Sequence, residues 1–509
     1  MISLDVIVGK PESVRADLVA AMIFEDQPGF GRRITEIQKS AGHVPFSVAS
    51  GAFKGKLGQT LIVPLAGRMT HQMVLIGAGP AGKFSLETAR RISAAAVKAA
   101  SAQHALKVVL QLPDAEALSP LPLLKAGVSL RDLAMAFAEG GALAAYRFTK
   151  YRTWKEGDFA GVKTFSFLIA SRKNLDTYKQ GVRDAALVCD ATWLARDLAN
   201  APGNEIYPES LARRARVAGR KHGFRVTVFD EKKIARLGMG GLLGVAKGSR
   251  NPPRFIIMET GAPRGRKRVP TIVLVGKGIT FDAGGISIKP SANMAEMKMD
   301  MSGAAAVIGA MQAAAHLRLP LHLIGLVPAA ENLPGGNALK PGDILRHFNG
   351  KTSEIENTDA EGRLILADAL SYASRYKPDL VVDLATLTGA VVVALGHVTT
   401  GMLGTSETGM QQLRAAGERT FERVWELPLF EEYDKLMKSD IADVKNAGAR
   451  WAGAITGAVF LKHFIGSYPW VHLDIAGTAM LEEPGEYTQR GGSGVGVRLL
   501  VDFLRHYKQ

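Results

Sequence analysis

The chain has 509 residues, of which 47% are apolar and 22% are charged, and its formal net charge is +15. This length exceeds one ordinary domain, so we expect two domains, and the apolar content excludes a disordered chain. Cys189 is the only cysteine, which excludes an intramolecular disulfide and a thiolate-rich metal site and favours a reducing compartment.

No segment resembles an export signal or a membrane span. The opening stretch MISLDVIVGKPESVRADLVA has acids early and no continuous apolar core after a basic head. The longest apolar stretch, VVDLATLTGAVVVALG, contains Asp383 and is shorter than the roughly 20 residues that a span needs. We therefore expect a soluble, cytoplasmic protein with no membrane partner.

The N-terminal part alternates short apolar strands with helices. Strands are expected at LDVIVG, TLIVPLAG, QMVLIGAG and LKVVLQLP, and Ala-rich helices at SLETARRISAAAVKAASA and LRDLAMAFAEGGALAAYRF. The alternation predicts a smaller α/β domain with a largely parallel sheet over residues 1–172. A linker helix over 173–200 follows and ends where Pro202 and Gly203 break the helical pattern.

A glycine motif in this part resembles two nucleotide-binding fingerprints. Gly77, Gly79 and Gly82 follow a strand and precede a helix, and Lys83 nearly completes a phosphate loop. Phe84 replaces the hydroxyl that would hold Mg²⁺, and no acid follows at the spacing that binds a ribose. We interpret the motif as a tight turn between strand and helix.

The C-terminal part, residues 201–509, alternates again. TIVLVGKG, LHLIGLVPA and PDLVVDLATL are typical of buried strands, and GAAAVIGAMQAAAHL is typical of a helix between them. This pattern predicts a larger α/β catalytic domain with a central mixed sheet flanked by helices.

Two basic clusters raise the question of an acidic partner. One lies on an expected helix (Arg213, Arg214, Arg216, Arg220 and Lys221), and the other is PRGRKR at 263–268. Neither is interleaved with aromatic residues, so the ordinary interpretation is a solvated helix face and a basic surface loop. DNA binding stays open as an alternative.

Acids and lysines concentrate at expected strand ends and helix starts of the larger domain. VGKGITFDAGGISIKP holds Lys277, Asp282 and Lys289, MKMD ends at Asp300, and NTDAEGRL holds Asp359, Glu361 and Arg363. Ligands of such sheets collect at the carboxyl ends of the strands. Converging carboxylates would repel one another unless cations are present. Two divalent ions that share carboxylates fit the number of carboxylates in these segments. Salt bridges with the nearby lysines are the alternative.

These segments also resemble a known family. NTDAEGRL looks like the signature of the leucine aminopeptidase (cytosol aminopeptidase) family, and VGKGITFDAGGISIKP with MKMDMSGAA resembles its other metal-site segment. LPGGNALKPGDI, VDLATLTGA and HLDIAGTA are similar to further family stretches. The likeness covers residues 195–509.

The resemblance implies a metal site, residue by residue. Lys277, Asp282, Asp300 and Glu361 would hold one ion, while Asp282, Asp359 and Glu361 would hold a second, exchangeable ion. Mn²⁺ or Zn²⁺ is expected, with Mg²⁺ or Co²⁺ as alternatives. A metal-bound lysine must be neutral.

The resemblance also implies an activity, namely the release of N-terminal amino acids, leucine and other apolar residues, from short peptides by attack of metal-activated water. Lys289 would polarise the scissile carbonyl, and Arg363 would hold a bicarbonate that acts as general base. The implied substrate pocket consists of Met297, Asn357, Thr386, Leu387, Gly389 and Ala476.

Further expectations follow from the family and from missing motifs. The family forms homohexamers with active sites facing an interior cavity, which would limit substrates to short peptides. The chain has no H-E-x-x-H and no G-x-S-x-G motif, so zincin and serine hydrolase chemistry is disfavoured. Asp383 and Asp474 are interpreted as structural, and no role is assigned to the histidines.

Overall fold

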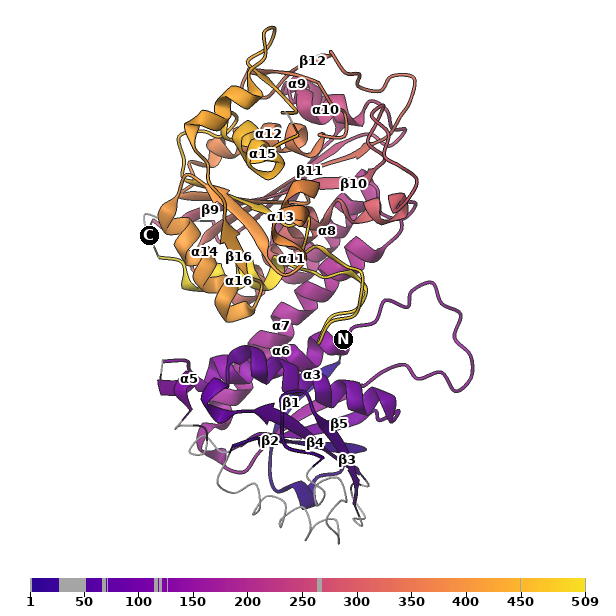
Figure 1. Ribbon diagram of the computed structural model, residues 1–509, viewed down its shortest axis with the longest axis vertical. Helices are drawn as coiled ribbons and strands as arrows, with labels where there is room; N and C mark the ends of the chain where they lie inside the picture. The colour runs from indigo at the N-terminus through magenta and orange to yellow at the C-terminus, as the bar shows by residue number, and fades with distance from the viewer. Residues whose placement is uncertain are drawn as a thin grey trace. The chain divides into compact units, whose positions relative to one another are not determined.

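The computed structural model describes residues 2–26, 52–65, 70, 72–113, 118, 121–125, 127–262, 268–448 and 450–508 (Figure 1). The chain divides into two compact units, one of Met1–Asp190 with Pro484–Gln489 and one of Ala191–Glu483 with Arg490–Gln509. Both are α/β, which confirms the predicted fold class. The division falls within helix α7 (Leu175–Asn200), and the limits of the three predicted segments stay a prediction.

The first unit contains, in its described part, a six-stranded sheet in the order β1-β6-β5-β2-β4-β3. The strands are β1 (Ser3–Val8), β2 (Leu18–Phe24), β3 (Thr60–Pro64), β4 (Gln72–Gly79), β5 (Lys107–Gln111) and β6 (Thr164–Ile169). All neighbours are parallel except β3 and β4, as a largely parallel sheet requires. The central strand β2 was not among the predicted strands, although it is a continuous apolar run like several of them.

Helices α3 (Leu86–Ala102) and α6 (Leu130–Ala144) pack against each other, and α5 (Pro122–Lys125) precedes α6. Ser85 and Ser129 cap α3 and α6 by accepting a hydrogen bond from a backbone N–H in the first turn. The glycine motif lies at the end of β4. A Cβ on Gly77 would lie 2.0 Å from the carbonyl oxygen of Lys56, so this glycine permits close backbone contact.

The second unit is built, over its described residues, on a nine-stranded mixed sheet. Its order is β16-β15-β18-β14-β9-β11-β8-β7, with β10 paired to β11. The strands are β7 (Arg225–Phe229), β8 (Arg254–Thr260), β9 (Thr271–Gly276), β10 (Gly278–Asp282), β11 (His322–Asn332), β14 (Leu380–Ala385), β15 (Thr400–Gly404), β16 (Val424–Glu426) and β18 (Trp470–Asp474). The central strands β18, β14, β9 and β11 are parallel, whereas β15 and β8 are antiparallel to their inner neighbours.

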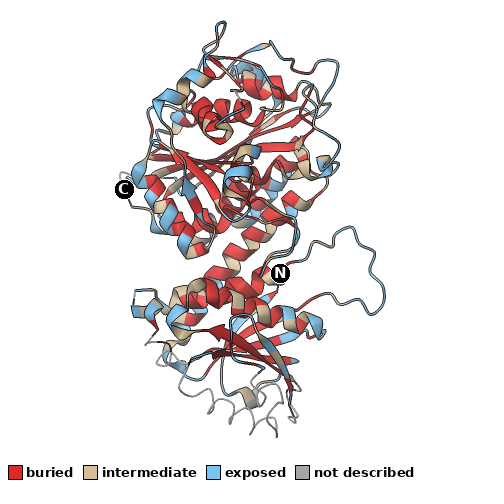
Figure 2. Cartoon of the chain, viewed as in Figure 1, coloured by how far each residue is buried: buried red, intermediate tan, exposed pale blue. Residues whose placement is uncertain are grey.

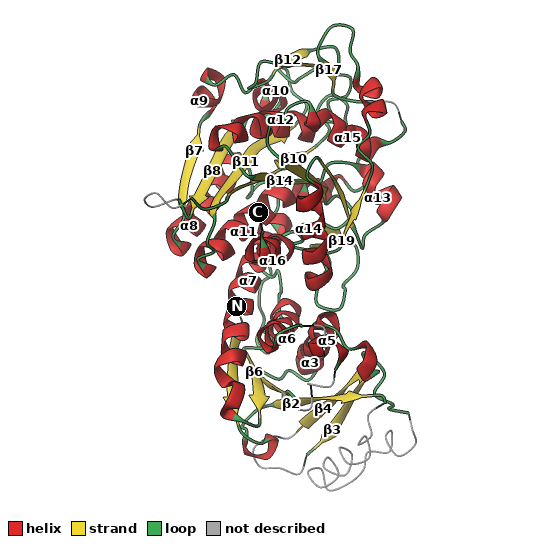
Figure 3. Cartoon of the chain, turned by 90° about the vertical axis from the view of Figure 1, so that its left-hand side faces the viewer, coloured by secondary structure: helices red, strands yellow, loops and turns green. Residues whose placement is uncertain are grey.

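Helices cover both faces of this sheet (Figure 3). One face carries α8 (Pro208–His222), α11 (Ser302–Leu317), α14 (Glu407–Thr420) and α16 (Val497–His506), and the other carries α10 (Gly240–Ala246), α12 (Gly362–Ala373) and α15 (Gly453–Lys462). Helices α9 (Glu231–Arg236) and α13 (Gly389–Leu395) lie further out. The central strands, α11 and α12 are almost wholly buried (Figure 2).

Smaller sheets complete the unit. They are β12 (Ile344–Arg346), β13 (Thr352–Glu354) and β17 (Val444–Lys445), and the pair β19 (Met480–Leu481) and β20 (Gly491–Gly492). Throughout the part of the chain that the structure describes, no helix combines the length and apolar character needed to cross a bilayer.

The basic cluster on α8 is a solvated face. All five of its cations are exposed, and Arg214 pairs with Glu205 at 2.7 Å. Of the second cluster, residues 263–267 lie outside the described residues, and Arg268 pairs with Asp379 at 2.6 Å. DNA binding by either cluster stays a prediction.

Candidate active site

The predicted metal and catalytic side chains gather at the carboxyl ends of β9 and β10. Lys277 connects these two strands, and Asp282 is the last residue of β10. Asp300 follows the short helix η4 (Met294–Met299), while Asp359 and Glu361 lie just before α12. This is the edge where ligands of α/β sheets bind.

Lys277 lies at the centre of the cluster and is 3% exposed. Its Nζ is 2.8 Å from Asp300 Oδ1 and 2.9 Å from Glu361 Oε1, and it donates a hydrogen bond to the carbonyl oxygen of Thr386 at 2.8 Å. Burial would lower the pKa of Lys277, but the charges of the neighbouring carboxylates outweigh burial and raise this pKa above its usual value. Lys277 is therefore an ammonium group here, and it would have to lose a proton to ligate a metal.

Lys289 joins the other two acids of the cluster. Its Nζ lies 2.8 Å from Asp282 Oδ2 and 2.5 Å from Asp359 Oδ1. Burial opposes the charged form, yet Asp282 and Asp359 raise the pKa of Lys289. All the predicted carboxylate ligands are thus brought together, each in contact with one of two lysines.

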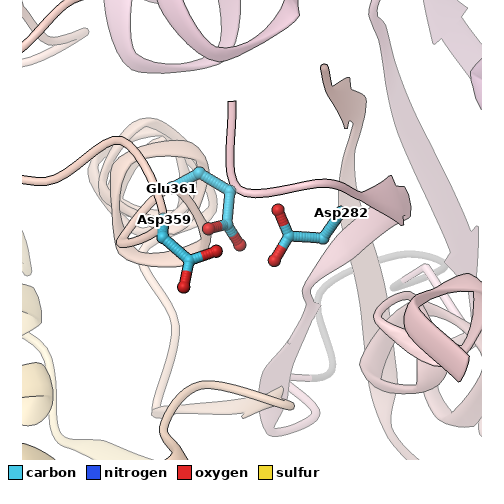
Figure 4. A group of neighbouring side chains, drawn as sticks. All are labelled: Asp282, Asp359 and Glu361. Atoms are coloured by element: carbon cyan, nitrogen blue, oxygen red, sulfur yellow. The ribbon is translucent and has the colours of Figure 1, made fainter. Parts of the chain in front are cut away.

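Three carboxylates converge closely enough to share a cation. One oxygen each of Asp282, Asp359 and Glu361 lies within 4.8 Å of the others. In Figure 4 the carboxylates of Asp359 and Glu361, from the start of α12, face that of Asp282. Four acids including Asp300 against two ammonium groups leave an excess of negative charge.

Buried oxygens of this cluster lack hydrogen-bond partners. Asp300 Oδ2 and Glu361 Oε2 are both inaccessible to solvent and accept no hydrogen bond. Burial, reinforced by neighbouring carboxylates, raises the pKa of Asp300, Asp359 and Glu361. Orphaned oxygens and surplus charge fit hard or borderline divalent cations, which oxygen ligands with one amine can hold.

The loop after β10 packs tightly against the signature segment NTDAEGRL, residues 357–364. Gly284 and Gly285 have φ values of +88° and +65°, and a Cβ on Gly284 would lie 2.9 Å from Asp359 Oδ1. The Thr358 hydroxyl donates to the carbonyl oxygen of Gly284 at 2.7 Å and accepts from the Ser287 N–H at 2.8 Å. Glycine is needed here both for the left-handed backbone and for space beside the carboxylate.

Two buried asparagines that the sequence analysis missed hold the acidic segments. At the end of β11, Asn332 Nδ2 donates to Asp282 Oδ1 at 2.8 Å and to the carbonyl oxygen of Thr358 at 3.0 Å. Asn446 Oδ1 accepts from the N–H groups of Glu356 and Asn357, and its Nδ2 donates to the Asn357 carbonyl at 2.7 Å. Asn332 ends β11, three residues beyond the predicted strand LHLIGLVPA, and Asn446 has no local signal.

Arg363 lies in the first turn of α12 and is 8% exposed. Its Nη1 donates to the carbonyl oxygen of Asn446 at 2.8 Å, while its buried Nε has no hydrogen-bond partner. Burial lowers the pKa of Arg363 to about 10. A guanidinium group with a spare buried donor can hold a planar anion.

The six predicted pocket residues divide into three groups. Thr386 Oγ1 donates to Asp300 Oδ1 at 2.7 Å, and Asn357 Oδ1 accepts from the Asp359 N–H at 2.8 Å, so both contact the cluster. The N–H groups of Leu387 and Ala476 both donate to Asp474 Oδ1, at 3.1 and 3.2 Å.

The remaining two pocket residues lie in helices, and the carbonyl oxygen of Met297 accepts from the Asp300 N–H at 3.4 Å. Met297 belongs to η4 and is half-buried, and Gly389 begins α13, where a Cβ would meet no atom within 4 Å. The pocket roles of all six residues stay a prediction.

The two acids interpreted as structural are indeed enclosed in protein. Asp383 accepts from Trp470 Nε1 and is paired with His472 Nδ1, both at 2.7 Å. Asp474 accepts from the Thr388 hydroxyl at 2.7 Å. Both acids are buried, and their partners are groups of the protein.

Comparison with known proteins identifies a family to which the chain is similar. The catalytic-domain model of the cytosol aminopeptidase family matches residues 193–501, and the N-terminal-domain model of that family matches residues 33–155. A probable cytosol aminopeptidase of Syntrophotalea carbinolica is 46% identical over 462 residues, covering 90% of each chain. One of Geobacter sulfurreducens is 45% identical over 483 residues, covering 94% of this chain and 95% of the relative.

Solved structures share the fold over nearly the whole chain. The bottromycin maturation enzyme BotP in complex with Mn superposes with a TM-score of 0.81 at 36% identity and covers 96% of this chain and 99% of its own. A tomato leucine aminopeptidase mutant gives a TM-score of 0.86 at 31% identity and covers 100% of this chain and 97% of its own. The fold and these matches together identify the class of protein, which is a peptidase. The chain belongs to the cytosol aminopeptidase family, as its signature segments predicted.

Proposed function

We propose that the protein is a metal-dependent leucyl aminopeptidase, which removes leucine and other apolar residues from the free N-termini of short peptides. The observation that carries the proposal is the cluster of four acids and two lysines, in which the buried Asp300 Oδ2 and Glu361 Oε2 have no hydrogen-bond partner. Such a cluster has an excess of negative charge, and a related enzyme, BotP, has been solved in complex with Mn. Membership of an aminopeptidase family supports the reaction class.

In this proposal the cluster holds two divalent ions. Lys277, Asp282, Asp300 and Glu361 would hold one, and Asp282, Asp359 and Glu361 would hold the other. When bound, such ions supply positive charge that polarises a carbonyl and makes water acidic enough to react near neutral pH. Mn²⁺ and Zn²⁺ suit this set of oxygen ligands and one amine.

The chain's own residues would bind and orient the peptide. Lys289, whose Nζ contacts Asp282 and Asp359, is placed to move its ammonium group from these acids to the carbonyl oxygen of the scissile bond. Arg363 would hold bicarbonate through its free Nε, and that anion would accept the proton of the attacking water. The acidic cluster itself favours a positively charged α-amino group, which an N-acetylated peptide lacks.

A direct test measures hydrolysis of leucine p-nitroanilide by protein stripped with a chelator and then supplied with Mn²⁺ or Zn²⁺. The expected result is activity that returns with metal and is confined to the free amine, with N-acetyl-leucine p-nitroanilide as control. Absence of activity with every metal would overturn the proposal. A hexamer in the cytoplasm is part of the same proposal, and a monomer in light scattering would exclude the hexamer.

A further inference from the structure

A pair of histidines lies on the second unit, on elements that do not carry the acidic cluster's acids and lysines. His222 is the last residue of α8, and His316 lies in the last turn of α11, 94 residues further along the chain. These helices pack against each other on one face of the sheet (Figure 3). The Nδ1 atoms of the two imidazoles are 3.4 Å apart, and the ring planes are inclined by 58°.

This separation is long for a hydrogen bond between two nitrogens but suits a shared metal ion. Good hydrogen bonds of nitrogen donors span about 2.7–3.2 Å between heavy atoms. Two nitrogens bound at about 2.0–2.1 Å to a tetrahedral ion lie about 3.3–3.4 Å apart. The observed 3.4 Å therefore matches a chelate without movement of either helix.

The surrounding backbone favours a cation. Both histidines occupy C-terminal last turns, where the carbonyl groups of α8 and α11 give each helix end a partial negative charge. The adjacent Lys221 and Arg318 oppose this effect, but both are exposed and their charges are screened by solvent.

We propose that His222 and His316 form a separate site for a borderline divalent transition-metal ion; Zn²⁺ has the tetrahedral geometry that the 3.4 Å separation matches, and Cu²⁺ serves as its spectroscopic probe. Imidazole suits these ions, whereas Mg²⁺ and Mn²⁺ prefer the oxygens of the acidic cluster. Among the described residues, no third imidazole, thiolate or carboxylate lies close enough to form a three-ligand group with the pair. The bound ion ties the C-terminal end of α8 to that of α11.

The test uses full-length protein in excess Mg²⁺, to which about one equivalent of Cu²⁺ is added. Pulsed EPR counts the imidazoles on copper through their remote nitrogens, and the acidic cluster contributes none because its donors are carboxylates and lysines. The expected result is two imidazoles in the wild type and one in either His222→Ala or His316→Ala. Copper affinity should fall by at least about tenfold in each variant, because the chelate is lost.

His506→Ala removes another partly exposed histidine, which is hydrogen-bonded to the Asp502 carbonyl, and serves as the matched control that keeps two imidazoles. One imidazole or none in the wild type would overturn the proposal, and this measurement does not depend on any variant folding. Two imidazoles retained in both single variants would overturn it as well. Loss of peptidase activity in the Cu²⁺-free variants is not expected, so failure of the aminopeptidase proposal is distinguishable from failure of this one.

Discussion

The side chain of Lys277 passes directly over the α-carbon of Gly362. A Cβ on Gly362 would lie 2.6 Å from Lys277 Cε and 2.8 Å from Nζ, so the first residue of α12 must lack a side chain for Lys277 to reach Asp300 and Glu361. The glycine of the signature segment thus has a packing role that the sequence pattern alone does not reveal.

Gly362→Ala should displace Lys277 from the acidic cluster. Because displacements of about 1 Å in an active site can cost about 100-fold in rate, we expect kcat/KM for leucine p-nitroanilide to fall by about that factor. Gly336→Ala is the matched control, since a Cβ there meets no atom within 4 Å and should leave kcat/KM unchanged. Unaltered kinetics in Gly362→Ala would show that Lys277 has room to move.

Asn446→Ala should destabilise the fold and disturb the signature segment together. It removes the hydrogen bonds of the buried Asn446 amide to the N–H groups of Glu356 and Asn357 and to the Asn357 carbonyl. Since each lost hydrogen bond costs about 0.5–1.5 kcal/mol, we expect the free energy of unfolding to fall by about 2–4 kcal/mol. Denaturant unfolding measures this change, and a loss below about 0.5 kcal/mol, the size of an ordinary surface substitution, would contradict it.

Glu361→Gln keeps the shape of the side chain but removes one of the charges proposed to hold metal. We expect activity with Mn²⁺ to fall by at least about 100-fold. Removing one group that stabilises charge in an active site commonly lowers kcat by about that factor. Glu356→Gln changes an exposed acid in the same segment and should retain activity. Full activity in Glu361→Gln would remove this residue from the site.

Metal-free protein should become less stable as pH rises. Burial raises the pKa of Asp300, Asp359 and Glu361 in the folded state, so their contribution to stability is present at low pH and is lost as pH rises through the folded pKa values. Tm measured in chelator between about pH 5 and pH 8 should therefore decrease, since the pKa of each of these acids is raised above its usual value. Added Mn²⁺ should make Tm less dependent on pH, and Tm of the Glu361→Gln variant should decrease less as pH rises. A Tm that increases over this window would contradict the explanation.

Arg363→Lys tests the proposed anion site. Lysine keeps the positive charge but loses the planar fork and the free Nε, so bicarbonate should no longer be held in two-point contact. We expect about tenfold lower activity, and the stimulation of the wild type by added bicarbonate under CO₂-free conditions should be absent from the variant. Arg346→Lys, an exposed change on β12, is the control.

The sequence predicted much of the fold because its strands and helices carry strong local patterns. Strands such as β9, β11 and β14 are continuous apolar runs, and α7 ends at Asn200, as the break at Pro202 and Gly203 indicated. β2 is a continuous apolar run as well, but it was not among the predicted strands.

The acidic cluster could be predicted because its members lie in three short segments of unusual composition. Its supports could not, since Asn446 reaches the signature segment from 89 residues away and no local pattern records that contact. The histidine pair illustrates the same limit: His222 and His316 lie on different helices, so a search for spacing along one helix cannot find them.

Lys277 and Lys289 also bear on the order of two events, the folding of the chain and the binding of metal. Their ammonium groups contact all four acids of the cluster, so the folded chain carries internal counter-ions for these charges. Small zinc domains differ, because they are unfolded until the ion arrives. If the cluster holds metal as proposed, metal uptake would be an exchange on a folded scaffold, in which the ion replaces the proton of Lys277.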